Sequence, residues 1–294
     1  MGEVTSTGVG YQDLIPNPAF PTAKLVERRQ IAEDLMVIKL ESSEPFKFKP
    51  GQYCTLGLGK IERAYSIVSA PYEKYLEIFV ELVPEGELTP QMFALKIGEY
   101  MSVRPRAKGI FVQDKKAHHH FMVSTVTGVA PSISMVRQYL HDLENGDTTD
   151  KQVYYIMYGA SYVGELTYDV EVNDLAVKYP EIVKFVPTIS RPTESQNADW
   201  TGVTGRVNNI AEKYLAKFDL PKDDTKVYAC GHPGMIEDMI ETLLPQGWNF
   251  VEERFWKPQS ITNSPASWTA NIIRWPRGLT SRQIGSRIAG VIDP

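Results

Sequence analysis

Thiols and long apolar runs are both scarce in this sequence. Cys54 and Cys230 are its only cysteines among 294 residues, whereas a disulfide framework, a zinc site or a cysteine-ligated iron–sulfur cluster needs more thiols. No apolar run approaches the roughly eighteen residues of a membrane span. The first residues lack the basic-then-apolar pattern of a secretory signal. We therefore expect a soluble, cytoplasmic protein without a metal centre of its own and without a membrane partner.

Basic charge is also in short supply. Lysine and arginine total 31 against 36 aspartate and glutamate residues, a net charge of −5, so a nucleic-acid partner is not expected. Neither Gly-x-Ser-x-Gly nor His-Glu-x-x-His occurs, which leaves the common hydrolase motifs without support. His118, His119 and His120 are consecutive, and neighbouring residues of an extended segment point to opposite faces. We expect a linker run there rather than a metal site.

The spacing of apolar residues predicts two domains between two terminal segments. Residues 1–20 are punctuated by proline and glycine and are expected to form an arm. Residues 21–115 are predicted to form an antiparallel β-barrel, because short apolar strands alternate with turn residues; the predicted strands include Leu35–Leu40, Gln52–Leu58, Tyr65–Val68 and Leu76–Val83.

From residue 116 to 256, predicted strands alternate with predicted helices. That alternation is typical of a doubly wound, largely parallel sheet. Residues 257–294 lose the periodicity and are expected to form a C-terminal extension. The strands are predicted at Phe121–Val126, Val153–Tyr158, Ile182–Ile189 and Lys226–Ala229, and the helices at Ser132–Leu143, around Leu175–Lys178, at Val207–Phe218 and at Met235–Leu244.

The segment Arg63-Ala64-Tyr65-Ser66 carries the most informative chemistry of the first domain. Residues two apart on a strand share a face, so a planar ring could stack on Tyr65 while its phosphates meet the Arg63 guanidinium. Ser66 would offer a hydroxyl at the edge of the ring. The alternative is an ordinary barrel strand with a surface arginine and a half-buried tyrosine.

This segment resembles the Arg-x-Tyr-Ser flavin motif of the ferredoxin–NADP(+) reductase family, and Phe48–Tyr53 resembles the strand that leads into that family's flavin site. The turn Gly86-Glu87-Leu88-Thr89 resembles the Gly-x-Leu-(Ser/Thr) turn at which the family holds the FAD pyrophosphate. Backbone N–H groups at the start of a helix suit an anion. A helix cap by Thr89 is the simpler interpretation of the same turn, and both can hold together.

In the second domain, Thr127-Gly128-Val129-Ala130-Pro131 resembles the family's Gly-Thr-Gly-x-Ala-Pro loop, where the pyrophosphate of the nicotinamide nucleotide lies at a helix N-terminus. Val126 stands where the family has its first glycine, and Ser161 stands where it has an arginine.

Ser190, Arg191 and Arg206 resemble the positions that hold the 2′-phosphate in NADP-using members of the family. Two arginines and a hydroxyl suit a dianion, whereas an NAD site would place an acid on the free ribose diol. The resemblance therefore favours NADP over NAD. Two solvated surface arginines are the alternative.

Cys230-Gly231-His232-Pro233-Gly234-Met235 resembles the family's Cys-Gly-x-Pro-x-Met motif, whose cysteine lies beside the nicotinamide. Residues 252–256 resemble the closing Glu-(Lys/Arg)-aromatic-Trp of bacterial members. The resemblance places Glu253 near the path of the hydride and Phe255 or Trp256 over the flavin. An inert buried cysteine is the alternative for Cys230.

The resemblance covers roughly Ala23 to Trp256. It implies an FAD-dependent reductase in which NADPH gives a hydride to the flavin N5 and electrons pass singly to a separate carrier, ferredoxin or flavodoxin. Ser66, Cys230 and Glu253 would be catalytic. FAD would be bound by Arg63, Ala64, Tyr65, Ser66, Gly86, Leu88, Thr89, Phe255 and Trp256, and NADP(H) by Thr127, Gly128, Ser190, Arg191, Arg206, Cys230 and Gly231.

Two other functions stay open. One is an NAD(P)H-dependent reductase that serves an oxygenase, siderophore iron or free flavin, since one fold hosts many activities. The other is a non-catalytic flavin-binding or assembly subunit, which is motivated by Val126, Ser161 and the C-terminal extension. The oligomeric state is not predicted.

Overall fold

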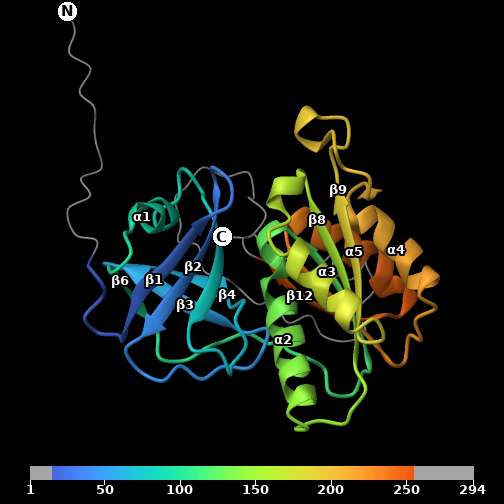
Figure 1. Ribbon diagram of the computed structural model, residues 1–294, viewed down its shortest axis with the longest axis horizontal. Coiled ribbons are helices and arrows are strands. Elements are labelled where there is room, and N and C mark those ends of the chain that lie inside the picture. The colour runs from blue at the N-terminus through green and yellow to red at the C-terminus, as the bar shows by residue number, and fades with distance from the viewer. Residues whose placement is uncertain (1–14, 255–294) are drawn as a thin grey trace, which may run out of the picture.

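A computed structural model describes residues 15–254, which form two six-stranded sheets side by side (Figure 1). The first sheet contains β1 (Thr22–Gln30), β2 (Leu35–Ser42), β3 (Tyr53–Leu58), β4 (Ile61–Ser66), β5 (Leu76–Glu81) and β6 (Tyr100–Val103), with α1 (Thr89–Ala94) between β5 and β6. The second contains β7 (His119–Thr125), β8 (Val153–Ala160), β9 (Val183–Ile189), β10 (Val203–Thr204), β11 (Thr225–Gly231) and β12 (Asn249–Arg254), with α2 (Ala130–Glu144), α3 (Asp169–Lys178), α4 (Val207–Lys217) and α5 (Pro233–Leu243).

The first sheet closes on itself as an antiparallel barrel. Its strand order is β4-β3-β6-β1-β2-β5. The two edges meet where Ile67, just past β4, bridges Ile78 on β5. Alternate residues point inward, and Leu25, Ile38, Leu56 and other buried aliphatic side chains fill the interior. Closure removes the exposed edges that an open sheet would present.

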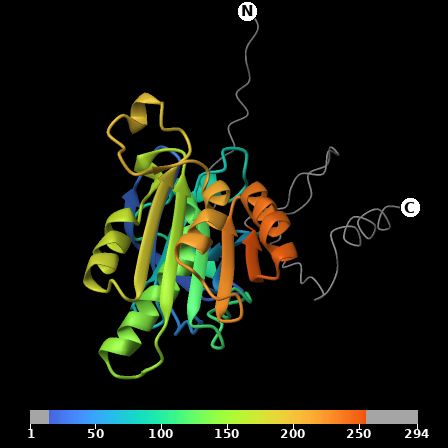
Figure 2. The same ribbon diagram turned by 90° about the vertical axis from the view of Figure 1, so that its right-hand side faces the viewer.

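The second sheet is parallel throughout, in the order β10-β9-β8-β7-β11-β12. Side chains of α2 and α3 pack with one face of the strands, and those of α4 and α5 with the other. The helices lie on both sides of the sheet in Figure 2. The fold is therefore the predicted barrel followed by a doubly wound α/β domain.

Three local expectations differ from the structure. The strand expected at Tyr65–Val68 is β4, which begins at Ile61 and ends at Ser66. Helix α3 begins at Asp169, well before Leu175. The histidines are not a linker run, because His119 begins β7 and His120 is completely buried, with its Nε2 2.7 Å from the side-chain oxygen of Gln152. The expected alternation of faces does hold there, since the His119 ring lies near Tyr155 whereas the His120 ring stacks on Tyr154.

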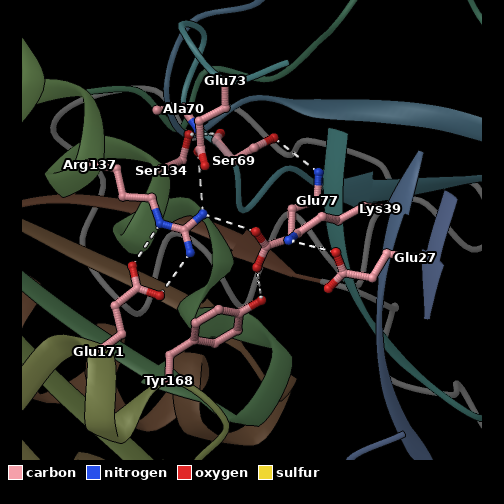
Figure 3. Close-up of polar contacts among 10 residues, drawn as sticks. All are labelled: Glu27, Lys39, Ser69, Ala70, Glu73, Glu77, Ser134, Arg137, Tyr168 and Glu171. Atoms are coloured by element: carbon pink, nitrogen blue, oxygen red, sulfur yellow. Dashed lines mark hydrogen bonds and ion pairs between the residues drawn. The ribbon is translucent and has the colours of Figure 1, made fainter. Parts of the chain in front are cut away.

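Helix α2 faces the barrel and makes several of the polar contacts between the domains (Figures 1 and 3). Arg137 donates to Glu77 of β5 at 3.1 Å and to Glu73 of the β4–β5 segment at 3.3 Å, and it binds Glu171 of α3 through two hydrogen bonds. Ser134 donates to the Ser69 carbonyl oxygen at 2.8 Å. The segment that follows the Arg63–Ser66 motif is thus fixed to the second domain.

No helix within residues 15–254 is both long and apolar enough to cross a bilayer. The same described residues contain no group of three or more histidine, cysteine, aspartate or glutamate side chains arranged to hold a metal ion.

Candidate functional site

The candidate site lies where the order of the parallel strands reverses. From β7 the chain crosses through α2 to β8, on one side of β7, whereas β11 pairs with the other side of β7. The helices that follow β7 and β11 consequently cover opposite faces of the sheet. In open α/β sheets, ligands bind outside the carboxyl ends of the strands at such a switch point.

Two glycines let the segments after β7 and β11 touch. A Cβ on Gly128 would lie 2.2 Å from the Cys230 carbonyl oxygen. Gly231 has φ +126° and a Cβ there would lie 2.3 Å from Thr125 Oγ1. The same hydroxyl accepts a hydrogen bond from the His232 N–H at 2.9 Å. Any side chain at either glycine would push the two segments apart.

Val126 takes a backbone conformation that suits glycine. Its φ is +42°, which is a strained value for a β-branched residue. This is the position at which the resemblance expects a glycine. The short 3₁₀ turn Val126–Val129 therefore keeps a glycine-like path although its first residue is valine.

Ser66, Glu253 and Cys230 meet between the barrel and the parallel sheet. Ser66 is the last residue of β4 and is buried, and its hydroxyl donates to Glu253 Oε1 at 2.7 Å. Glu253 on β12 is the register partner of Cys230 on β11. All three predicted catalytic residues thus come together from both domains.

Burial sets the protonation of this cluster. It raises the pKa of the Glu253 carboxyl to about 7, against the opposing effect of the Ser66 hydrogen bond. Burial, with the nearby Glu253, also raises the pKa of the Cys230 thiol well above its usual range. Cys230 is accordingly a neutral packing group at physiological pH, whereas Glu253 exchanges a proton in that range.

Arg63, Ala64 and Tyr65 lie on β4 as the sequence predicts. Arg63 pairs with the exposed carboxylate of Glu87, so the structure brings the arginine to the turn Gly86–Thr89. Tyr65 is half-buried against the barrel core, and burial raises the pKa of its hydroxyl. Arg63 and Tyr65 share a face of the strand, which is the arrangement that a ring with attached phosphates requires.

The structure of the turn Gly86–Thr89 differs from the expected helix cap. Thr89 does not cap α1: its hydroxyl accepts from the Val83 N–H at 2.9 Å and donates to the Val83 carbonyl, and the helix has no side-chain cap. Leu88 is buried in the barrel core, so its side chain is unavailable to a ligand. A Cβ on Gly86 would lie 2.9 Å from the Val83 carbonyl oxygen. A role for this turn in binding FAD stays a prediction that rests on its backbone.

The predicted 2′-phosphate residues share the carboxyl edge of the second sheet. Ile189 of β9 pairs with Thr204 of β10, and Arg191 and Arg206 each follow two residues later. Ser190 donates its backbone N–H to the Ala160 carbonyl at the end of β8. The contact of these residues with a nucleotide stays a prediction.

Several residues near the site were missed by the sequence analysis. Tyr162 and Glu194 flank Arg191; the Arg191–Glu194 spacing of three was the available signal. Gly109 packs on the Tyr53 ring, and its Cβ would lie 3.4 Å from Glu253 Oε2. No sequence signal pointed to that contact. Phe255 and Trp256 lie outside the described residues.

The residues present fit the two groups that the resemblance implies. A flavin ring needs an aromatic or apolar face and a hydrogen-bonding edge, which Tyr65 and Ser66 supply on consecutive positions of β4. Diphosphate groups need cations and free backbone N–H groups. Arg63 pairs with Glu87 in the turn Gly86–Thr89, and Arg191 and Arg206 lie just past the ends of β9 and β10. An antiparallel barrel joined to a doubly wound sheet, with a serine–carboxyl–thiol cluster between them, is typical of a flavin- and nicotinamide-dependent oxidoreductase.

Comparisons with known proteins agree with this class. Residues 22–109 match the oxidoreductase FAD-binding domain and residues 122–241 the oxidoreductase NAD-binding domain. The flavodoxin/ferredoxin–NADP reductase of Escherichia coli is 30% identical over 202 residues, which cover 65% of this chain and 77% of that protein. The phenol hydroxylase P5 protein of Acinetobacter pittii is 28% identical and is covered over 61% of its length. A ferredoxin NADP+ reductase structure from Neisseria gonorrhoeae, with bound FAD and NADP, has TM-score 0.70 and 22% identity, over 82% of this chain and 100% of that one.

This chain belongs to the ferredoxin–NADP reductase family of FAD- and NAD-binding oxidoreductases.

Proposed function

We propose that this protein is an NADPH-dependent FAD enzyme that passes electrons one at a time to a ferredoxin or flavodoxin in the cytoplasm. The observation that carries the proposal is the cluster of Ser66, Glu253 and Cys230 between the two domains. The name of the Escherichia coli relative supports the choice of carrier. In this proposal residues 21–115 hold FAD and residues 116–256 hold NADP(H).

Each domain contributes a separate part of the binding work. Tyr65 would stack on the flavin ring and Ser66 would hydrogen-bond at its edge, while Arg63 and the backbone of the Gly86–Thr89 turn would bind the diphosphate. The turn at Thr127 and Gly128 would bind the NADP pyrophosphate. Ser190, Arg191 and Arg206 would bind the 2′-phosphate.

When bound, FAD supplies the chemistry that accepts two electrons from the nicotinamide and releases them singly. The protein's own residues arrange that exchange. Cys230 would present only a compact, neutral thiol to the nicotinamide ring, while Gly231 lets the segment after β11 lie against Thr125. Glu253 holds or releases a proton through Ser66 Oγ, since the pKa of the carboxyl lies at about 7.

A reductase that serves an oxygenase is the second candidate. The relatives named as phenol hydroxylase components favour it: the P5 protein of Acinetobacter pittii and the reductase component of phenol 2-monooxygenase of Pseudomonas sp. strain CF600, which is 31% identical over 223 residues. This chain covers 61% and 59% of their lengths. An enzyme of this kind would accept NADH readily and would reduce ferredoxin and flavodoxin poorly.

The test begins with the visible spectrum of the purified protein, followed by anaerobic titration with NADPH and separately with NADH. Bleaching of flavin bands by NADPH at much lower concentration than by NADH, and transfer to added ferredoxin or flavodoxin, would support the proposal. Bleaching without transfer to either carrier would favour the oxygenase-serving function. A protein that takes up no FAD would refute both.

A further inference from the structure

Tyr162, Arg191 and Glu194 form a hydrogen-bonded triad at the carboxyl edge of β8 and β9. Arg191 donates to the Tyr162 hydroxyl oxygen at 2.8 Å, and that hydroxyl donates to Glu194 Oε2 at 2.6 Å. The second oxygen of Glu194 lies 3.5 Å from Arg191. The guanidinium also lies 5.4 Å from the centre of the Tyr162 ring. The cation expected to receive a 2′-phosphate therefore already has a carboxylate partner.

The backbone beneath the triad is fixed. Asn197 is buried, and its amide group donates to the carbonyl oxygens of Ser161 and Arg191 while its oxygen accepts from the Val163 N–H. Glu165 accepts from the N–H groups of Ser161 and Tyr162. The two charged side chains of the triad are exposed, by 53% for Arg191 and 45% for Glu194. They can exchange partners without refolding the loops.

The charge of Glu194 acts in opposite directions on the two nicotinamide nucleotides. A 2′-phosphate dianion would have to replace the carboxylate at Arg191 and would be repelled by it. A free ribose diol carries no charge and has two hydroxyl donors, which a nearby carboxylate accepts. The site thus contains both a cation that suits NADPH and an acid that suits NADH.

We propose that Glu194, through Tyr162 and Arg191, is the residue that limits the discrimination of this protein in favour of NADPH over NADH. This inference rests on the proposed function, because it takes the edge of β8 and β9 as the site of the adenosine ribose. Glu194 contacts neither the flavin nor the nicotinamide in this assignment. It sets the ratio of the two affinities and not the rate of hydride transfer.

The experiment measures binding of NADP+ and NAD+ to the FAD-loaded protein by calorimetry. These nucleotides differ only in the 2′-phosphate and cannot reduce the flavin. The variants are Glu194→Gln and Arg191→Gln. The matched control is Glu181→Gln, which makes the same charge change on an exposed residue at the amino end of β9. Each titration is run at low and at high salt.

We expect Glu194→Gln to tighten NADP+ binding by up to about fivefold, the upper end of the range for an exposed charge pair, and to leave NAD+ binding unchanged or weaker. The gain should shrink at high salt, and Glu181→Gln should change neither affinity. An unchanged ratio in Glu194→Gln, with NADP+ weakened in Arg191→Gln, would overturn this inference alone. An Arg191→Gln protein that binds NADP+ as the unmodified protein does would overturn the assignment of the 2′-phosphate site as well.

Discussion

Arg137 offers the sharpest test of how the two domains are held together. Its side chain is 14% exposed and faces three carboxylates (Figure 3): Glu77, which is 9% exposed, and Glu73 and Glu171, which are about one third exposed. Glu77 also accepts from the Tyr168 hydroxyl at 2.7 Å. Replacing Arg137 by methionine keeps much of the side-chain volume and removes the only cation within ion-pair distance of these three carboxylates among residues 15–254.

The stability lost in Arg137→Met depends on which of the three carboxylates are shielded from water. Removing one partner of a buried ion pair costs about 3–5 kcal/mol, because the remaining charge is left uncompensated. Water can reach Glu73 and Glu171 and reduce their share, so Glu77 dominates. We expect Arg137→Met to lower the free energy of unfolding by about 3 kcal/mol, the lower end of that range.

Urea unfolding followed by circular dichroism measures this loss. Arg104→Met is the control, because Arg104 binds Glu62 through two hydrogen bonds of similar length but on the barrel surface, with 43% of its side chain exposed. That change should cost less than about 1 kcal/mol. Adding Glu77→Gln to Arg137→Met should recover part of the loss, since it removes the uncompensated charge.

This account of the domain interface would be refuted if Arg137→Met costs no more stability than the Arg104 control, or if the added Glu77→Gln lowers stability further.

The loss of Arg137 should also affect the reaction. Glu73 and Glu77 follow Arg63–Ser66 along the chain, and Arg137 belongs to α2, which follows the turn Val126–Val129. In the proposed function, reduction of the flavin by NADPH should therefore slow more than FAD content falls.

Three further changes test the site and the second domain. Burial raises the pKa of Glu253 from 4.5 to about 7, so the unmodified protein loses stability as that carboxyl ionises. As pH rises from 5 to 8, Glu253→Gln should therefore become more stable than the unmodified protein by up to about 3 kcal/mol. An equal difference in unfolding free energy at the two pH values would contradict this. Gly231→Ala should lower the free energy of unfolding in urea by about 2–4 kcal/mol, because the added Cβ would overlap Thr125 Oγ1. Gly146 also has a positive φ but open space around it, so Gly146→Ala should cost only about 1 kcal/mol. Burial lowers the pKa of His120 to about 4, so the unfolded chain takes up the proton first as pH falls. This costs the unmodified protein about 3 kcal/mol of stability between pH 6.5 and 4, and His120→Gln should remove most of that loss. The same loss of stability in the variant over this pH range would refute the prediction.

The alternation of strands and helices was predictable because local apolar patterns decide it. Strands such as Leu35–Ser42 and Val153–Ala160 alternate or run as continuous apolar segments, and each was expected within two residues of its observed end. β12 was not singled out, since half of Asn249–Arg254 is charged and no residue of it is fully buried. Its place in the sheet comes from pairing with β11, which a local pattern does not record.

The meeting of Ser66 and Glu253 could not be derived from spacing, because 187 residues separate them. The resemblance predicted their shared role, and the fold brings them together because Ser66 ends β4 while β12 pairs with β11. The orientation of Thr89 could not be predicted either. A threonine hydroxyl in a turn can bond to different backbone groups, and the geometry of this turn places it against the N–H and the carbonyl oxygen of Val83.

Three arginine–glutamate pairs of this protein fall into two groups according to the exposure of the carboxylate. Glu87, the partner of Arg63, is 63% exposed and Glu194 is 45% exposed, whereas Glu77 is only 9% exposed. Water can take over the solvation of the first two carboxylates, so an incoming phosphate can replace them at small cost. It could not replace Glu77 without leaving a dry, unpaired charge. In the proposed assignment, the same pair of residue types would therefore serve as an exchangeable anion site at Arg63 and at Arg191, and as a permanent link between the domains at Arg137.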